Sequence, residues 1–178
     1  MIDDAELWIK IVAGDREAFE RWYRQSAPRL RVFLRHTFAG GPAVDDVLQE
    51  TYAQVWRSRR GFGAERGSLA AWLFGIARKQ AASWRRRQKP EEGLEWEPAI
   101  PDEVERSSMV TDALSRLSEE GRMLLWLREV EGQTYQELSA ILDLPVTTVR
   151  SRLHAAREAM RRLWQCGQQN PGGNHELH

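Results

Sequence analysis

The residues best suited to reading nucleic acid lie early in a predicted helix spanning residues 146–163, on the side away from its apolar positions. This side has no acidic residue before Glu158, although a merely solvated helix face usually mixes both charges. Arginine recognises guanine edges and phosphates, and small hydroxyl residues allow close approach. The pattern predicts a helix that reads the major groove of duplex DNA. Its predicted DNA-facing residues are Thr147, Thr148, Arg150, Ser151, Arg152, His154 and Arg157.

A second candidate site lies between residues 57 and 87, where arginines are interspersed with tryptophan and phenylalanine. Basic side chains that follow a backbone, together with aromatic rings that stack on unpaired bases, are what binding of single-stranded DNA requires. A structural explanation carries equal weight from these residues alone. Trp72 has the spacing of a core residue, and the basic run 85–87 is also typical of a solvated helix end.

The elements that must position these residues are predicted to be helices. Apolar residues recur at helical spacing between Phe19 and Leu34, between Val44 and Trp56, and between Leu69 and Trp84. Pro28 interrupts the first of these runs, which predicts a bend or a division into two helices. Further along, Thr134 and Glu137 have the spacing of a capping box before a short helix, and a turn at 143–145 separates it from the long helix. This is a helix-turn-helix layout.

Charge divides the chain into parts, although the formal net charge is zero. Residues 1–89 carry 17 basic and 10 acidic side chains, residues 90–108 carry 1 and 7, and residues 109–178 carry 8 and 9. The segment 89–101 contains three prolines, a glycine and four glutamates, a composition typical of a linker. We therefore expect an all-α protein of two small helical domains, 1–89 and 109–165, joined by a flexible acidic linker at 90–108. A disordered tail is expected at 166–178.

Several function classes are disfavoured by the sequence. No stretch approaches the roughly 20 apolar residues that span a bilayer, and the first ten residues lack the layout of a signal peptide. We expect a cytoplasmic protein without membrane insertion. Neither a Ser-His-Asp arrangement nor a phosphate-binding glycine loop is present, and Cys166 and His175 form no metal-site pattern. We expect no enzyme, and no catalytic, cofactor or metal residues.

Two groups of segments resemble the sigma-70 family of transcription initiation factors, in particular its extracytoplasmic-function (ECF) group. DREAFERWY, VDDVLQETYAQVW and FGAERGSLAAWLFGIARKQ resemble region 2 of that family. The run LSEEGRMLLWLREVEGQTYQELSAILDLPVTTVRSRLHAAREAMRRL resembles region 4. Together they cover about residues 15–87 and 113–163, in the family's order and at its spacing. Lys79 departs from the pattern, since many members have asparagine there.

The resemblance implies a factor that binds core RNA polymerase, through its clamp helices and flap, and recognises promoter DNA. The domain 1–89 corresponds to region 2 and the domain 109–165 to region 4, whose long helix is similar to the reader of the −35 element. An anti-sigma factor is an expected further partner. The implied polymerase-docking residues are Asp45, Asp46, Gln49 and Glu50. The residues implied in capture of the single-stranded −10 element are Arg59, Arg60, Phe62, Trp72, Arg78, Lys79 and Arg85.

The alternative hypothesis is a helix-turn-helix regulator that binds duplex DNA without polymerase and uses its first domain for dimerisation. A basic loop and a tryptophan-rich helix are poorly suited to burial in a dimer interface, which favours the initiation factor. Helix capping is the alternative role for Asp45, which lies in the first turn of its predicted helix.

Overall fold

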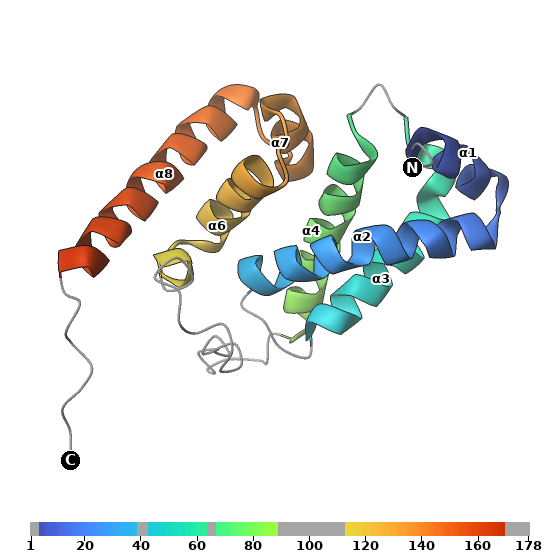
Figure 1. Cartoon of the computed structure of the whole chain (residues 1–178), viewed down its shortest axis with the longest axis horizontal. Coiled ribbons are helices and arrows are strands. Elements are labelled where there is room, and N and C mark those ends of the chain that lie inside the picture. Colours follow the sequence, from blue (N-terminus) through green and yellow to red (C-terminus); the bar gives the residue numbers. More distant parts are fainter. Residues whose placement is uncertain (1–3, 39–42, 64–66, 89–112, 170–178) are drawn as a thin grey trace, which may run out of the picture.

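The computed structural model describes residues 4–38, 43–63, 67–88 and 113–169, and within these ranges the regular structure is helical. The amino-terminal domain consists of α1 (Asp4–Ala13), α2 (Arg16–Thr37), α3 (Ala43–Ser58), a short 3-10 turn (Arg59–Gly61) and α4 (Leu69–Gln88). Figure 1 shows α3 and α4 beside α2, with α1 next to the amino-terminal end of α2. Leu30, Phe33, Leu48 and Val55 fill the space between these helices and are almost fully buried.

Helix α2 begins as the sequence indicates, because the Asp15 carboxylate accepts a hydrogen bond from the Ala18 amide at 3.0 Å. Pro28 lies inside α2, which continues to Thr37. The predicted division into two helices is therefore wrong. Pro28 is exposed, whereas Ala27 and Leu30 are buried, so the ring occupies the solvent side while packing of the other side holds both halves in one helix.

The carboxy-terminal domain consists of α6 (Glu119–Leu125), a π-helical turn (Trp126–Val130), α7 (Tyr135–Leu142) and α8 (Val146–Gln169). The Ser118 hydroxyl accepts a hydrogen bond from Gly121 and caps α6. Asp143 takes the left-handed conformation, with φ at 57°, and ends α7. Val149 and Leu153 of α8 are buried against α6 and α7. These elements form the predicted helix-turn-helix arrangement.

Helix α8 extends to Gln169, beyond the predicted end of the domain at residue 165. The expectation that the disordered tail begins at residue 166 is thus wrong for residues 166–169, which are helical. Propagating an existing helix adds one backbone hydrogen bond per residue at little cost, so a polar segment can continue a helix that packing has nucleated. Residues 170–178 and the predicted linker at 90–108 lie outside the described residues.

The two domains pack against each other. Helix α4 lies against α7, and α2 lies against α6 (Figure 1). Their buried apolar residues belong to one hydrophobic cluster, which includes Phe74 and Ala77 of α4 and Leu138 and Ile141 of α7. Polar contacts across the boundary include the Arg29–Glu131 ion pair, in which the Glu131 side chain is 3% exposed. His36 of α2 also stacks on Trp126, with ring centroids 4.8 Å apart.

Replacing Phe33 tests the core of the first domain. Phe33 is 0% exposed and its ring lies edge-on to Phe74 at 4.9 Å. Phe33→Ala leaves a cavity, so we expect the free energy of unfolding to fall by about 3–5 kcal/mol in urea denaturation. The neighbouring Val32, which is 37% exposed, is the control. Val32→Ala should change stability by about 0.5 kcal/mol or less, and equal losses for both variants would contradict this packing.

Candidate nucleic-acid interface

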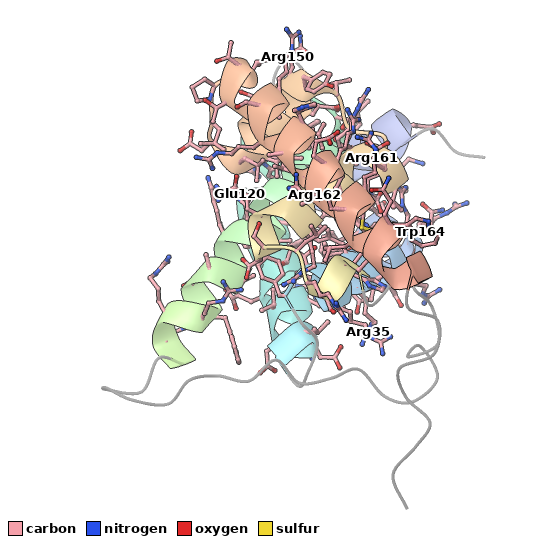
Figure 2. The ribbon with its side chains drawn as sticks, turned by 90° about the vertical axis from the view of Figure 1, so that its left-hand side faces the viewer. Arg35, Glu120, Arg150, Arg161, Arg162 and Trp164 are labelled. Carbon is pink, nitrogen blue, oxygen red and sulfur yellow. The ribbon has the colours of Figure 1, made fainter. Side chains whose placement is uncertain are left out.

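The beginning of α8 projects from the molecule with its predicted DNA-reading residues on the surface. Thr147, Arg150, Ser151 and His154 are exposed, and Thr148 is partly buried. Figure 2 shows Arg150 at the outer end of this helix. The turn before α8 is held by the Leu144 amide, which donates to the Ser139 carbonyl at 3.1 Å, and by the Ser139 hydroxyl, which donates to the Leu144 carbonyl. The start of the reading helix is therefore rigidly joined to α7.

Acids of the second domain hold the other two arginines of the predicted set. Nη1 of Arg152 donates to both carboxylate oxygens of Glu120, at 2.6 and 2.7 Å. Arg157 donates to Glu129 from Nε and Nη2, at 3.0 and 2.6 Å, and this pairing raises the pKa of its guanidinium. These two side chains thus lie along the flanks of α8 that face the π turn and α6, whereas the hydroxyl residues lie on its outer side.

Arg150 adopts a third arrangement. Its guanidinium lies 5.4 Å from the centre of the Tyr135 ring, which belongs to α7. A cation over an aromatic face gains roughly 0.5–1 kcal/mol at an exposed site, which is small enough to be exchanged for a contact with a base or phosphate. The Tyr135 ring therefore orients the Arg150 side chain, but only through a weak contact that a DNA contact could replace.

The aromatic residues of the second predicted set lie in a cluster of rings. Phe62 and Trp72 are partly buried, with centroids 5.5 Å apart. Trp8 of α1 contacts both edge-on, at 5.7 Å and 5.4 Å, and also contacts Trp22 at 5.6 Å. The two predicted rings are thus brought together, but within packing that also supports the domain.

Sequence reasoning missed the contribution of α1 to this site. Leu7, Trp8 and Ile11 have helical spacing and are buried, so the signal was present in a segment that the motifs did not cover. Nε1 of Trp8 is buried and has no hydrogen-bond partner among the described residues.

The basic residues around the ring cluster have different surroundings. Arg59 stacks on Trp56 at 4.3 Å and donates from Nη1 to the Trp56 carbonyl at 2.7 Å. Arg60 and Lys79 are exposed. Arg59 is therefore held against the end of α3, while Arg60 and Lys79 face solvent.

Two basic residues of α4 contact the carboxy-terminal domain. Nε of Arg78 donates to the Ile141 carbonyl of α7 at 2.8 Å. Arg85 pairs with Glu119 of α6 and lies 5.4 Å from the centre of the Phe38 ring. In this arrangement the predicted strand-binding side of α4 is partly covered by the second domain.

The residues predicted to dock polymerase, three acids and one glutamine, lie along the outer side of α3. Asp45, Asp46 and Gln49 are exposed, and Glu50 is partly buried. Asp45 pairs with Arg31 of α2, and Glu50 pairs with Arg57 at 2.6 Å. Asp46 and Gln49 therefore form the more accessible half of this surface.

An open groove with a volume of about 820 Å³ runs between α6 and α8. Its apolar lining includes Leu124, Ala156, Ala159 and Leu163, and Arg116, Arg152 and Arg162 lie among them. Figure 2 shows Glu120 and Arg162 on this side of the molecule. Such a lining suits an amphipathic helix that carries acidic residues.

The described residues contain no group of three or more histidine, cysteine, aspartate or glutamate side chains placed to hold a metal ion. No helix in the part of the chain that the structure covers is both long and apolar enough to span a membrane.

Comparison with known families matches both halves of the chain. Residues 22–91 match the model of sigma-70 region 2, and residues 107–160 match that of sigma-70, region 4. The ECF RNA polymerase sigma factor RpoE of Cereibacter sphaeroides is 30% identical over 156 residues, which cover 83% of this chain and 86% of that protein. The RNA polymerase sigma factor CarQ of Myxococcus xanthus is 31% identical, over 84% of this chain and 91% of its own.

Solved structures agree with the fold. CnrH, in complex with the cytosolic domain of CnrY, matches with a TM-score of 0.68 and 23% identity over 92% of this chain and 97% of its own. The sigma factor RpoE in complex with the anti-sigma factor NepR, from Bartonella quintana, matches with a TM-score of 0.66 and 24% identity over 83% of this chain and 96% of its own. With region 2 and region 4 matched in order and a relative 30% identical over most of both lengths, this chain belongs to the ECF group of the sigma-70 family.

Proposed function

We propose that this ECF sigma factor directs promoter-specific initiation by dividing DNA recognition between its domains, with α8 reading the −35 element and α4 with its preceding loop binding the non-template strand of the −10 element. The observation that carries the proposal is the surface of α8. Thr147, Ser151 and His154 are exposed on one side, with Arg150 beside them. These side chains suit close approach to base edges in the major groove.

Arg152 and Arg157 have a different role in this proposal. Each is already paired with a glutamate, and a base contact would require that pair to be broken. Arginines at the edges of a reading helix are well placed to contact the phosphates, which fix the position of the protein without specifying the sequence. We assign the base contacts to the outer side of α8 and phosphate contacts to its flanks.

Strand capture in the first domain is supported by aromatic surface next to exposed cations. Phe62 and Trp72 are only partly buried, and Arg60 and Lys79 lie on the adjacent elements. Stacking of one base on an aromatic ring is worth about 1–3 kcal/mol, which is comparable with the few kcal/mol that unstacking a base costs. Opening of the −10 element then needs no external energy source once polymerase holds the DNA.

Polymerase contacts are proposed at two surfaces. The exposed acidic side of α3 suits basic partners, and we assign it to the clamp helices of core polymerase. The groove between α6 and α8 is the proposed site for the polymerase flap. We also propose an anti-sigma factor as a regulatory partner, since a structural neighbour was solved in complex with one. A non-enzymatic role in the cytoplasm follows from this function.

The direct test is reconstituted transcription with core polymerase on a genomic promoter library. We expect run-off products that start at a set of sites sharing one −35 motif and one −10 motif. The absence of initiation at any site would reject the proposal, and sequence-specific binding of duplex DNA without polymerase would point to an ordinary helix-turn-helix regulator.

Replacing Arg150 tests base reading by α8. Arg150→Ala should lower discrimination between the preferred −35 sequence and a mutated one by about 1–3 kcal/mol, measured by competition binding of the holoenzyme. Arg161, which is exposed later on α8 and pairs with Glu158, is the control, and Arg161→Ala should keep the discrimination. An equal loss of affinity on all sequences would instead make Arg150 a phosphate contact.

Replacing the accessible polar residues Asp46 and Gln49 tests docking to the clamp helices. Asp46→Asn combined with Gln49→Ala should weaken binding to core polymerase on the order of ten-fold, which corresponds to about 1.4 kcal/mol. The urea unfolding curve should stay unchanged, because both side chains are exposed. Glu17→Gln, an exposed change in the first turn of α2, is the control. Unchanged polymerase affinity of the double variant would remove α3 from the docking surface.

A further inference from the structure

One carboxylate accepts hydrogen bonds at the amino-terminal ends of two helices that belong to different domains. Glu137 is the third residue of α7, and its Oε2 accepts hydrogen bonds from the amide and hydroxyl of Thr134, at 2.8 and 2.9 Å. The Thr134 hydroxyl in turn accepts from the Glu137 amide at 3.2 Å, which completes the capping box. The other oxygen, Oε1, accepts from the Ser68 amide at 3.2 Å. Ser68 lies immediately before α4.

Helix α4 cannot complete a capping box by itself. Ser68 supplies half of one, since its hydroxyl accepts from the Ala71 amide at 3.1 Å. The returning hydrogen bond requires glutamate or glutamine at position 71, and alanine has no acceptor there. Glu137 supplies that acceptor from α7. Although burial alone would raise the pKa of Glu137, the hydrogen bonds from Ser68 and Thr134 lower it, as expected for a carboxylate used in its charged form.

The same side of α4 contacts α7 further along. Gly75 lies against α7, since a Cβ atom built there would be in ordinary van der Waals contact with the Ile141 Cα atom, at 3.9 Å. One turn later, Arg78 donates to the Ile141 carbonyl at 2.8 Å. The contact therefore runs from Ser68 to Arg78, and it includes an arginine of α4 that the family resemblance implies in capture of the −10 strand.

We propose that α7 and the non-template strand compete for this side of α4, and that Glu137 is the latch that favours the closed arrangement of the two domains. The inference rests on the function proposed above for α4. Arg78 is held through Nε by the Ile141 carbonyl, and α7 packs on the side of α4 that carries Arg78. A strand that lies along this side of α4 therefore requires α7 to move away. The apparent dissociation constant of the strand then rises as the open fraction falls. The latch keeps free sigma factor from binding melted DNA, and separation of the domains on polymerase releases α4.

Two substitutions open the latch by different means. Glu137→Gln keeps the α7 capping box, because glutamine serves at that position, but it has one acceptor oxygen and cannot serve Thr134 and Ser68 in the observed way. Gly75→Leu places a bulky side chain against Ile141 while favouring the α4 helix itself. Gly75→Ala is the matched control, since its Cβ meets only ordinary van der Waals distances. Circular dichroism should show unchanged helix content for all three.

The experiment measures domain separation and strand binding on the same full-length proteins. Spin labels on cysteines replacing the exposed Gln25 and Gln165, in a Cys166→Ser background, report the distance between the domains. Strand binding uses a fluorescent single-stranded oligonucleotide with the non-template −10 sequence of a promoter obtained from the transcription test. We expect Gly75→Leu to lengthen the distance and Glu137→Gln to tighten strand binding about five-fold, the effect of losing about 1 kcal/mol of closure. Gly75→Ala should match the wild type in both.

The outcomes separate the latch from the function on which it rests. If Gly75→Leu and Glu137→Gln leave both the distance and the strand affinity at wild-type values, the latch does not exist. If the distance lengthens while strand affinity stays constant, α7 does not compete for α4 and the proposal is overturned. If the distance lengthens but no variant binds any strand, the function assigned to α4 fails while the latch stands.

Discussion

The packing of α7 is the constraint on which the rest of the structure depends. One side of this eight-residue helix sets the turn that positions α8, and another lies against α4. Leu138 and Ile141 are almost completely buried, which leaves α7 little freedom to shift without disturbing both neighbours. The element that orients α8, the proposed reader of duplex DNA, is therefore also the element that covers α4, the proposed strand-binding helix.

The packing of the two domains also brings opposite charges together. The formal net charge is zero, yet basic residues dominate residues 1–89, and two of them pair with acids of the second domain. Arg29 pairs with Glu131 and Arg85 pairs with Glu119 across the domain boundary. Both arginines are largely exposed, so each pair contributes at most about 1 kcal/mol to stability. The pairs favour this arrangement of the domains, but the apolar packing between α4 and α7 contributes more.

The aromatic cluster around Trp72 shows why a packing role and a binding role are difficult to separate. Trp8 meets Trp22, Phe62 and Trp72 edge to face, which stabilises the junction of α1, α2 and α4. The same rings are only partly buried at Phe62 and Trp72, so they retain surface on which a base could stack. A site built from core residues gains rigidity from the fold, and its cost is that substitutions there also affect stability.

Much of this protein follows from local signals in the sequence. The capping box at Thr134, together with apolar spacing, predicted the helices and the helix-turn-helix, because capping and periodicity are properties of neighbouring residues. At Pro28 local signals left a bend and a division into two helices as alternatives, and the division is wrong, because tertiary packing keeps one helix intact. Local signals also failed at residues 166–169, where α8 continues. The residue types of the proposed DNA-reading surface were also visible in the sequence, since an absence of acids along one helix side is a linear pattern.

Tertiary structure alone decided which of those residues are available. Arg150 lies over Tyr135, whereas Arg152 and Arg157 are paired with glutamates of preceding elements, and no spacing rule distinguishes the three. Likewise, the link between Glu137 and Ser68 joins residues 69 positions apart. Helix periodicity reports which side of a helix is apolar, but it contains no information on which distant helix covers that side. That choice depends on the complementary shape and charge of surfaces that exist only after the chain has folded.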